Sequence, residues 1–220
     1  MTYRLPTTVS ERDDARAVAY LERYFGRPYT GAHFDEWPER APDRFTADDL
    51  VAVSFLSVFV PPMAARELLL TAADRFADLL AAIGPDRDLV EEVDPVGPEW
   101  PAWRLYRAVR ELGGVGPTIA SKLLARKRPR LLPIYDSVVG QVTGSSEQWE
   151  PLRQLLRADG GTLHQHLVGL RHQAGVPAHV SPLRIYDVLT WMEGKDQAYR
   201  PQTREEQLGA DLADPGTPED

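Results

Sequence analysis

Apolar residues recur every three or four positions along most of the chain, and this spacing predicts helices rather than strands. In the first such segment, Leu21 and Phe25 share one helical face. Ser10 and Asp13 resemble a capping box at its start. The chain therefore begins with a capped amphipathic helix, followed by a loop at 26–44 that is rich in proline, glycine and aromatic residues.

The most apolar run, LVAVSFLSVFV at 50–60, lies between a cap signal and two prolines. Thr46 with Asp49 again matches a capping box, and Pro61 and Pro62 cannot continue a helix. A strand is the alternative for this run, but the cap and the length favour a helix. By the same criteria the remaining helices are predicted at 63–83, 86–93, 102–112, 117–128, 136–142, 147–158, 162–174 and 182–193.

These elements predict an all-α fold with one helical body over 1–195. We expect its core at about 47–142, with 1–46 and 143–195 packing on it. Residues 196–220 are polar, acidic and poor in large apolar side chains, so we expect a disordered tail there.

The formal net charge of −8 is unevenly distributed. Residues 196–220 hold seven acidic and two basic residues and thus carry −5 of this total. By contrast, 122–130 holds five basic residues and no acidic one. A local basic patch can form a binding site despite a negative total, so nucleic-acid binding stays possible but is expected to be weak and salt-sensitive.

Several classes of site are excluded by composition. The chain has no cysteine, which excludes disulfides, thiolate metal sites and iron–sulfur clusters. His164 and His166 are two positions apart, so on a helix they point in different directions, and no metal or cofactor is expected. The N-terminus lacks the apolar core of a secretory signal, and the run at 50–60 is about half of a membrane span. We therefore expect a cytoplasmic protein without a membrane partner.

The segment LGGVGP at 112–117 lies between two predicted amphipathic helices. Its glycines permit positive φ and close backbone approach, and Val115 can pack between the helices. The free N–H groups of the turn and of the next helix could then bind a phosphate. Lys122 and Arg126 share a helix face and could contact flanking phosphates. The plainer alternative is a glycine turn between packed helices with a solvated basic face.

These residues resemble the helix-hairpin-helix motif of the base-excision DNA glycosylase superfamily typified by endonuclease III. The matching positions are Leu112, Gly114, Val115, Gly116, Ala120, Pro133 and Asp136. Two residues, Ile134 and Tyr135, stand where the family has one apolar residue before the aspartate. The resemblance covers roughly 47–142, and the segment KRPRLLPIYDSVV at 127–139 is also similar to segments of actinobacterial proteins of unknown activity.

The resemblance implies a glycosylase-like helical bundle that binds DNA and hydrolyses the N-glycosidic bond of a flipped base. Asp136 would be the catalytic carboxylate. The family's lyase members carry a lysine where this chain has Thr118, so a monofunctional enzyme is expected. Ser57, Val58 and Phe59 stand where the family often has a polar residue that inserts into the duplex.

The residues expected to bind nucleic acid are Gly113, Gly114, Val115, Gly116, Thr118, Lys122 and Arg126. The alternative is a non-catalytic DNA-binding or structural module in which Asp136 is only a helix N-cap. The sequence leaves open whether the nucleic acid is DNA or RNA.

Two further groups of side chains are candidates for a substrate pocket. The loop at 26–44 offers Tyr29, His33, Phe34, Asp35 and Trp37, which could stack on a base or read its edge, or could instead anchor the loop. Arg184, Asp187 and Trp191 share one side of the 182–193 helix, where an internal ion pair is expected and a pocket-lining role is the alternative.

Overall fold

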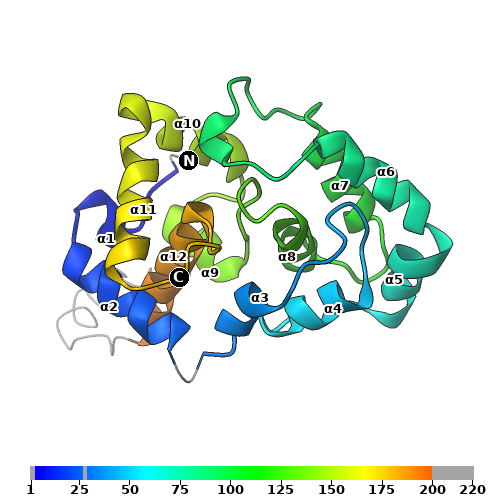
Figure 1. The fold of residues 1–220 in the computed structure, drawn as a ribbon, viewed down its shortest axis with the longest axis horizontal. Coiled ribbons are helices and arrows are strands. Elements are labelled where there is room, and N and C mark those ends of the chain that lie inside the picture. The colour runs from blue at the N-terminus through cyan, green and yellow to red at the C-terminus, as the bar shows by residue number, and fades with distance from the viewer. Residues whose placement is uncertain (1–2, 27–28, 200–220) are drawn as a thin grey trace, which may run out of the picture.

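The computed structural model describes residues 3–26 and 29–199, and every regular element within these ranges is a helix (Figure 1). The all-α prediction is therefore confirmed. None of the described helices is long and apolar enough to cross a membrane. Most of the predicted tail, 200–220, lies outside the described residues.

The α-helices are α1 (Thr7–Ser10), α2 (Asp14–Phe25), α3 (Ala32–Glu36), α4 (Ala47–Ser54), α5 (Pro62–Arg66), α6 (Ala73–Ile83), α7 (Pro101–Arg110), α8 (Pro117–Lys127), α9 (Ser137–Thr143), α10 (Trp149–Arg157), α11 (Thr162–Gln173) and α12 (Pro182–Tyr199). A π-helix spans Glu67–Thr71, and 3₁₀ turns span Leu89–Glu91 and Ala158–Gly161.

The helices form two groups (Figure 1). In one, α8 packs against α4 and α7, and α7 packs against α6. In the other, α12 packs against α9, α11 and α2. The hairpin at 112–116 joins α7 to α8, and residues 128–136 lead from α8 into the second group.

The cap signals in the sequence correspond to observed helix starts. Thr46 and Asp49 form the expected capping box of α4. Asp13 accepts a hydrogen bond from the Arg16 N–H, so α2 begins at Asp14 and not near Ser10, which instead ends α1. The start of α4 was predictable because its cap is a local interaction within one turn, whereas the capping box predicted at Ser10 and Asp13 is wrong.

The predicted helix at 50–60 is wrong in its second half, because α4 ends at Ser54 and residues 55–61 are not helical. Pro61 and Pro62 have no N–H groups to donate to the carbonyls of the preceding turn. The chain turns instead at Ser57, whose φ is +59°.

Other boundaries also differ from the predictions. The 63–83 segment is interrupted by the π-helix and by Ala72, whose φ of −125° is not helical. The loop at 26–44 contains α3, and 86–93 forms only a single 3₁₀ turn. The last helix continues past 193 to Tyr199, so the first residues of the predicted tail are helical.

The second group holds α9 very close to α12. A Cβ atom on Gly194 of α12 would lie 2.4 Å from Val138 Cγ1 and 2.9 Å from Val142 Cγ2 of α9. Only a glycine permits this approach. It places Asp136, at the start of α9, beside the middle of α12.

The exposed basic face predicted for 117–128 is wrong, since its cations are buried. Arg126 is 7% exposed, and its guanidinium lies 3.2 Å from Asp49 Oδ1 and donates to the carbonyls of Trp37 and Pro38. Lys127, which is 2% exposed, pairs with Asp49 and with Glu39. Charged groups removed from water require such partners, and here the partners come from the preceding loop and from α4.

We expect Asp49→Ala to lower the free energy of unfolding by about 3–5 kcal/mol, because it leaves two buried cations without their shared carboxylate. Urea unfolding followed by circular dichroism measures this. Asp48→Ala, in the same turn of α4, is the matched control and should cost less than about 1 kcal/mol. Equal losses for the two variants would contradict a structural role for the buried cluster.

Candidate functional site

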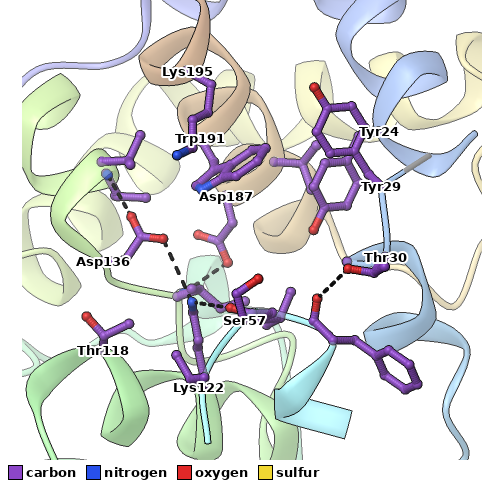
Figure 2. A pocket seen from close by; sticks show the side chains of 18 of the residues that line it. Tyr24, Tyr29, Thr30, Ser57, Thr118, Lys122, Asp136, Asp187, Trp191 and Lys195 are labelled. Atoms are coloured by element: carbon purple, nitrogen blue, oxygen red, sulfur yellow. Dashed lines mark hydrogen bonds and ion pairs between the residues drawn. The ribbon is translucent and has the colours of Figure 1, made fainter. Parts of the chain in front are cut away.

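A cavity of about 380 Å³ lies where the two helix groups meet (Figure 2). Its walls come from α2, the loop at 29–31, the segment 55–58, α8, residues 134–139 and α12. This volume is in the range of small-molecule sites, roughly 300–1,000 Å³. Segments far apart in the sequence thus build one site.

Asp136 lines this cavity as the N-cap of α9. Its Oδ1 accepts a hydrogen bond from the Val139 N–H at 3.0 Å, and its Oδ2 lies 3.9 Å from Lys122 Nζ. The side chain is 14% exposed. The carboxyl group therefore has one oxygen committed to the helix and one directed toward Lys122 (Figure 2).

Lys122 points into the cavity, whereas the sequence predicted that it would face solvent or phosphate. Its Nζ donates to the Leu56 carbonyl at 2.8 Å, which ties α8 to the segment after α4. Burial lowers the pKa of Lys122 below its usual value, Asp136 opposes this by raising it, and Arg184 lowers it further. Thr118, one turn earlier on α8, also lines the cavity.

Three aromatic side chains form the opposite wall. The rings of Tyr24 and Tyr29 are stacked with centroids 5.8 Å apart and an interplanar angle of 12°. Trp191 meets Tyr29 edge-on at 5.8 Å, and Lys195 Nζ lies 5.3 Å from the centre of the Trp191 ring. A flat ligand would find aromatic surface here, facing the Asp136–Lys122 pair across the cavity (Figure 2).

The expected ion pair within α12 is wrong. Arg184 instead bonds both oxygens of Asp35 at 3.0 Å and donates to the Tyr24 hydroxyl at 2.7 Å. Asp187 lines the cavity, and its Oδ2 accepts from the Ile134 N–H at 2.9 Å. The pocket-lining alternative therefore holds for Arg184, Asp187 and Trp191 alike.

Of the five loop residues predicted to read a substrate, Tyr29 alone lines this cavity. His33 is exposed and lies 2.9 Å from Glu36 Oε2, and Phe34 is buried beneath the Arg184 guanidinium. Asp35 is paired with Arg184, and the Trp37 carbonyl accepts from Arg126. Phe34, Asp35 and Trp37 thus anchor the loop to the protein body, whereas His33 faces solvent.

The hairpin at 112–116 packs against the segment that follows α4. Gly114 has a φ of +79°, and a Cβ there would lie 2.9 Å from Pro61 Cγ. Val115 is buried, and its carbonyl accepts from Arg110 Nη1 at 2.9 Å. Gly113 is exposed, and within the described ranges no hydrogen bond is recorded for the N–H groups of Gly113, Gly114, Gly116, Thr118 or Ile119.

Lys122 and Lys195 also line the cavity, and neither was predicted to do so. For Lys122 a signal existed, since it is four residues after Thr118 and must share its helix face. For Lys195 there was none, because the last helix was predicted to end at 193.

Comparison with known proteins adds one finding. A family model described as a family of unknown function (DUF6308) matches residues 17–194. No match was found among curated proteins or among solved structures.

Replacing Gly114 by alanine should destabilise the protein by at least about 1–2 kcal/mol, because the left-handed backbone is unfavourable for alanine and Pro61 blocks the added methyl group. Gly113→Ala is the matched control, since a Cβ there meets no atom within 4 Å, and it should change stability by less than about 0.5 kcal/mol. Thermal unfolding of both variants tests this. A Gly114→Ala protein as stable as the control would refute the packing of hairpin on Pro61.

The three lysines of the chain, Lys122, Lys127 and Lys195, permit a direct measurement of the Lys122 pKa by NMR of ¹³Cε-labelled lysine. We expect Lys122 to titrate below the usual lysine value because burial penalises the ammonium form. Asp136→Asn should lower this pKa further, since the carboxylate favours the charged amine. Ser137→Ala is the neutral control. A Lys122 pKa at or above the usual value would contradict the burial of the amine.

Proposed function

This chain belongs to the DUF6308 family of unknown function, and we propose that it hydrolyses the N-glycosidic bond of a nucleotide in DNA. The proposal rests on the cavity. The observation that carries the proposal is that Asp136 opens into an aromatic-walled cavity that is also lined by Thr118, a residue of the helix after the hairpin. A cap sealed beneath other side chains would have left no room for a substrate.

Asp136 is the group that acts on the sugar. Departure of a base leaves positive charge on the sugar, and a nearby carboxylate stabilises that charge, as in glycoside hydrolysis. The Val139 N–H fixes the orientation of the carboxyl group, while Oδ2 stays available to the cavity. Lys122, whose Nζ lies 3.9 Å from Asp136 Oδ2, forms the rest of the polar end of the cavity.

The base occupies the aromatic end of the cavity. A base must leave the duplex stack before its glycosidic bond can be attacked, and stacking on side-chain rings compensates the lost base stacking. Tyr29 and Trp191 provide two partly exposed rings at right angles, supported by the buried Tyr24. Such a corner suits a planar heterocycle.

The DNA backbone is held by the hairpin and the start of α8. Free N–H groups at a helix N-terminus attract a phosphate. Phe59, 77% exposed, lies on the same segment as Ser57, which lines the cavity, and Pro61, which touches the hairpin. An exposed apolar ring in this position can enter the space that a flipped base leaves. Arg126 takes no part, because its donors are occupied.

The alternative function is a non-catalytic module with Asp136 as a plain N-cap. It is favoured by the Val139 hydrogen bond, by the negative net charge and by the burial of Lys122 and Arg126. It offers no reason for a buried lysine and an aromatic wall around the same carboxyl group.

The test uses Asp136→Asn, which preserves the N-cap because asparagine caps helices as well as aspartate does. We expect wild type to release a base from at least one duplex in a panel of damaged bases. The variant should be slower by about 100-fold or more, as for loss of a positioned catalytic group. Unchanged release by Asp136→Asn, or no release by wild type from any duplex, would refute the proposal.

Binding gives an independent measurement. Fluorescence anisotropy at low salt should show that wild type prefers a duplex with a cationic abasic-site analogue over an undamaged duplex. Asp136→Asn should remove this preference, because the analogue mimics the sugar charge. Gly116→Ala should weaken binding to both duplexes, since its methyl group meets no protein atom closer than 4.0 Å but would stand before a bound phosphate. Equal binding of both duplexes by wild type would support the non-catalytic module.

A further inference from the structure

Asp187 is a second carboxyl group in the cavity, and one of its oxygens has no partner. Among the described residues, buried side-chain atoms without a hydrogen bond occur in Trp37, Gln148, His166 and Asp187. Of these, Asp187 belongs to the lining of the Asp136 cavity. Asp187 is 3% exposed, and the oxygen without a hydrogen-bond partner is Oδ1.

The two oxygens of Asp187 have different surroundings. Oδ2 accepts from the Ile134 N–H, whereas Oδ1 receives no donor. A buried ionised carboxylate would require donors on both oxygens, so this arrangement suits a carboxylic acid with its proton on Oδ1. Burial raises the pKa of Asp187 well above its usual value, against the lowering effects of Arg184 and the Ile134 N–H, and Asp35 and Asp136 raise it further.

Asp136 and Asp187 therefore differ in environment although they share a cavity. Asp136 is partly exposed, capped by an N–H group and 3.9 Å from an ammonium group. Asp187 is buried, and the nearest cation on its own helix, Arg184, is committed to Asp35 and Tyr24. Two carboxyl groups in such different environments are the usual arrangement for separate acid and charge-stabilising roles.

We infer that Asp187 donates a proton to the departing base, and that the substrate base is therefore one that is uncharged before cleavage. This inference rests on the proposed N-glycosidic hydrolysis. The base would present a carbonyl oxygen or an imine nitrogen to α12, where Oδ1 lacks an acceptor for its proton.

Hydrolysis begins when the bond between C1′ and the base nitrogen breaks and its electron pair goes to the base. The Oδ1 proton of Asp187 transfers to the base, which leaves as a neutral molecule, and Asp187 becomes a carboxylate. Asp136 stabilises the sugar cation until water adds to C1′, and the proton released by that water restores the acid through Asp136 or solvent.

The need for a proton donor depends on the charge of the substrate base. A purine alkylated on N7 or N3 carries a positive charge and leaves as a neutral molecule without any proton donor. An uncharged base leaves as an anion unless an acid protonates it. A protonated Asp187 therefore accelerates release of an uncharged base but not of a cationic one.

The experiment compares two duplexes of one sequence, carrying hypoxanthine, which is uncharged, or N7-methylguanine, which is cationic. Asp187→Asn is the variant, because its amide oxygen can still accept from the Ile134 N–H while its NH₂ replaces the Oδ1 hydroxyl. We expect wild type to release hypoxanthine, and the variant to do so about 100-fold more slowly or worse. Release of N7-methylguanine needs no acid and should fall far less, so the ratio of the hypoxanthine rate to the N7-methylguanine rate should drop by about 100-fold. Thermal unfolding shows separately that the variant is folded. Asp136→Asn should slow any release that wild type shows from either duplex.

The outcomes distinguish this inference from the proposed function. Release of N7-methylguanine alone by wild type would overturn the role of Asp187 and leave the hydrolysis standing. So would equal slowing of both duplexes by Asp187→Asn in a variant whose thermal unfolding matches wild type, because that pattern indicates a positioning role. Release of neither base, together with none from uracil or 8-oxoguanine duplexes, would overturn both.

Discussion

The arrangement of this protein depends on cationic side chains that α8 carries into the interior. Lys122, Arg126, Lys127 and Arg128 are all less than 10% exposed. Each finds acceptors on segments distant in the sequence: the Leu56 carbonyl, Asp49, Glu39, and the carbonyls of Pro42 and Leu80. Because buried charges are costly without partners, these contacts restrict where the loop before α4 and the segment after it can lie.

The same requirement shapes the cavity. Lys122 holds the segment at 55–58 by the Leu56 carbonyl, so this segment becomes one wall. Gly194 lets α9 approach α12 closely, so Asp136 comes to lie in the same cavity as Asp187. The cavity is therefore a consequence of how two helix groups are joined and not of any single motif.

The contrast between Asp136 and Asp187 also arises from this junction. Asp136 stands at a helix start, where N–H groups and Lys122 surround it. Asp187 lies in α12, whose residues 182–190 are all buried. One residue type thus acquires two environments because a helix end reaches the cavity edge, while a helix middle is enclosed by its neighbours.

Much of the fold could be predicted from local signals. The starts of α4, α8 and α9 were predictable because caps, proline and glycine act within one turn. The ends of α4 and α12 could not be predicted, because a run of hydrophobic residues does not show where tertiary contacts end a helix. In the candidate site, Asp136 and Thr118 were identified by their spacing from the hairpin, and Tyr29 by its place in an aromatic loop.

What the sequence alone determined is therefore the helical class, a glycine-rich turn between two helices, and an aspartate that caps a helix twenty residues after it. The tertiary structure alone decided which charges face inward. A helix-face pattern groups Lys122 with Arg126 but does not say whether that face meets water or other carbonyls. Likewise, the pairing of Arg184 with Asp35, and not with Asp187, required α3 to lie against α12. Local chemistry sets the elements, but the protonation and exposure of each side chain depend on neighbours that only folding brings into contact.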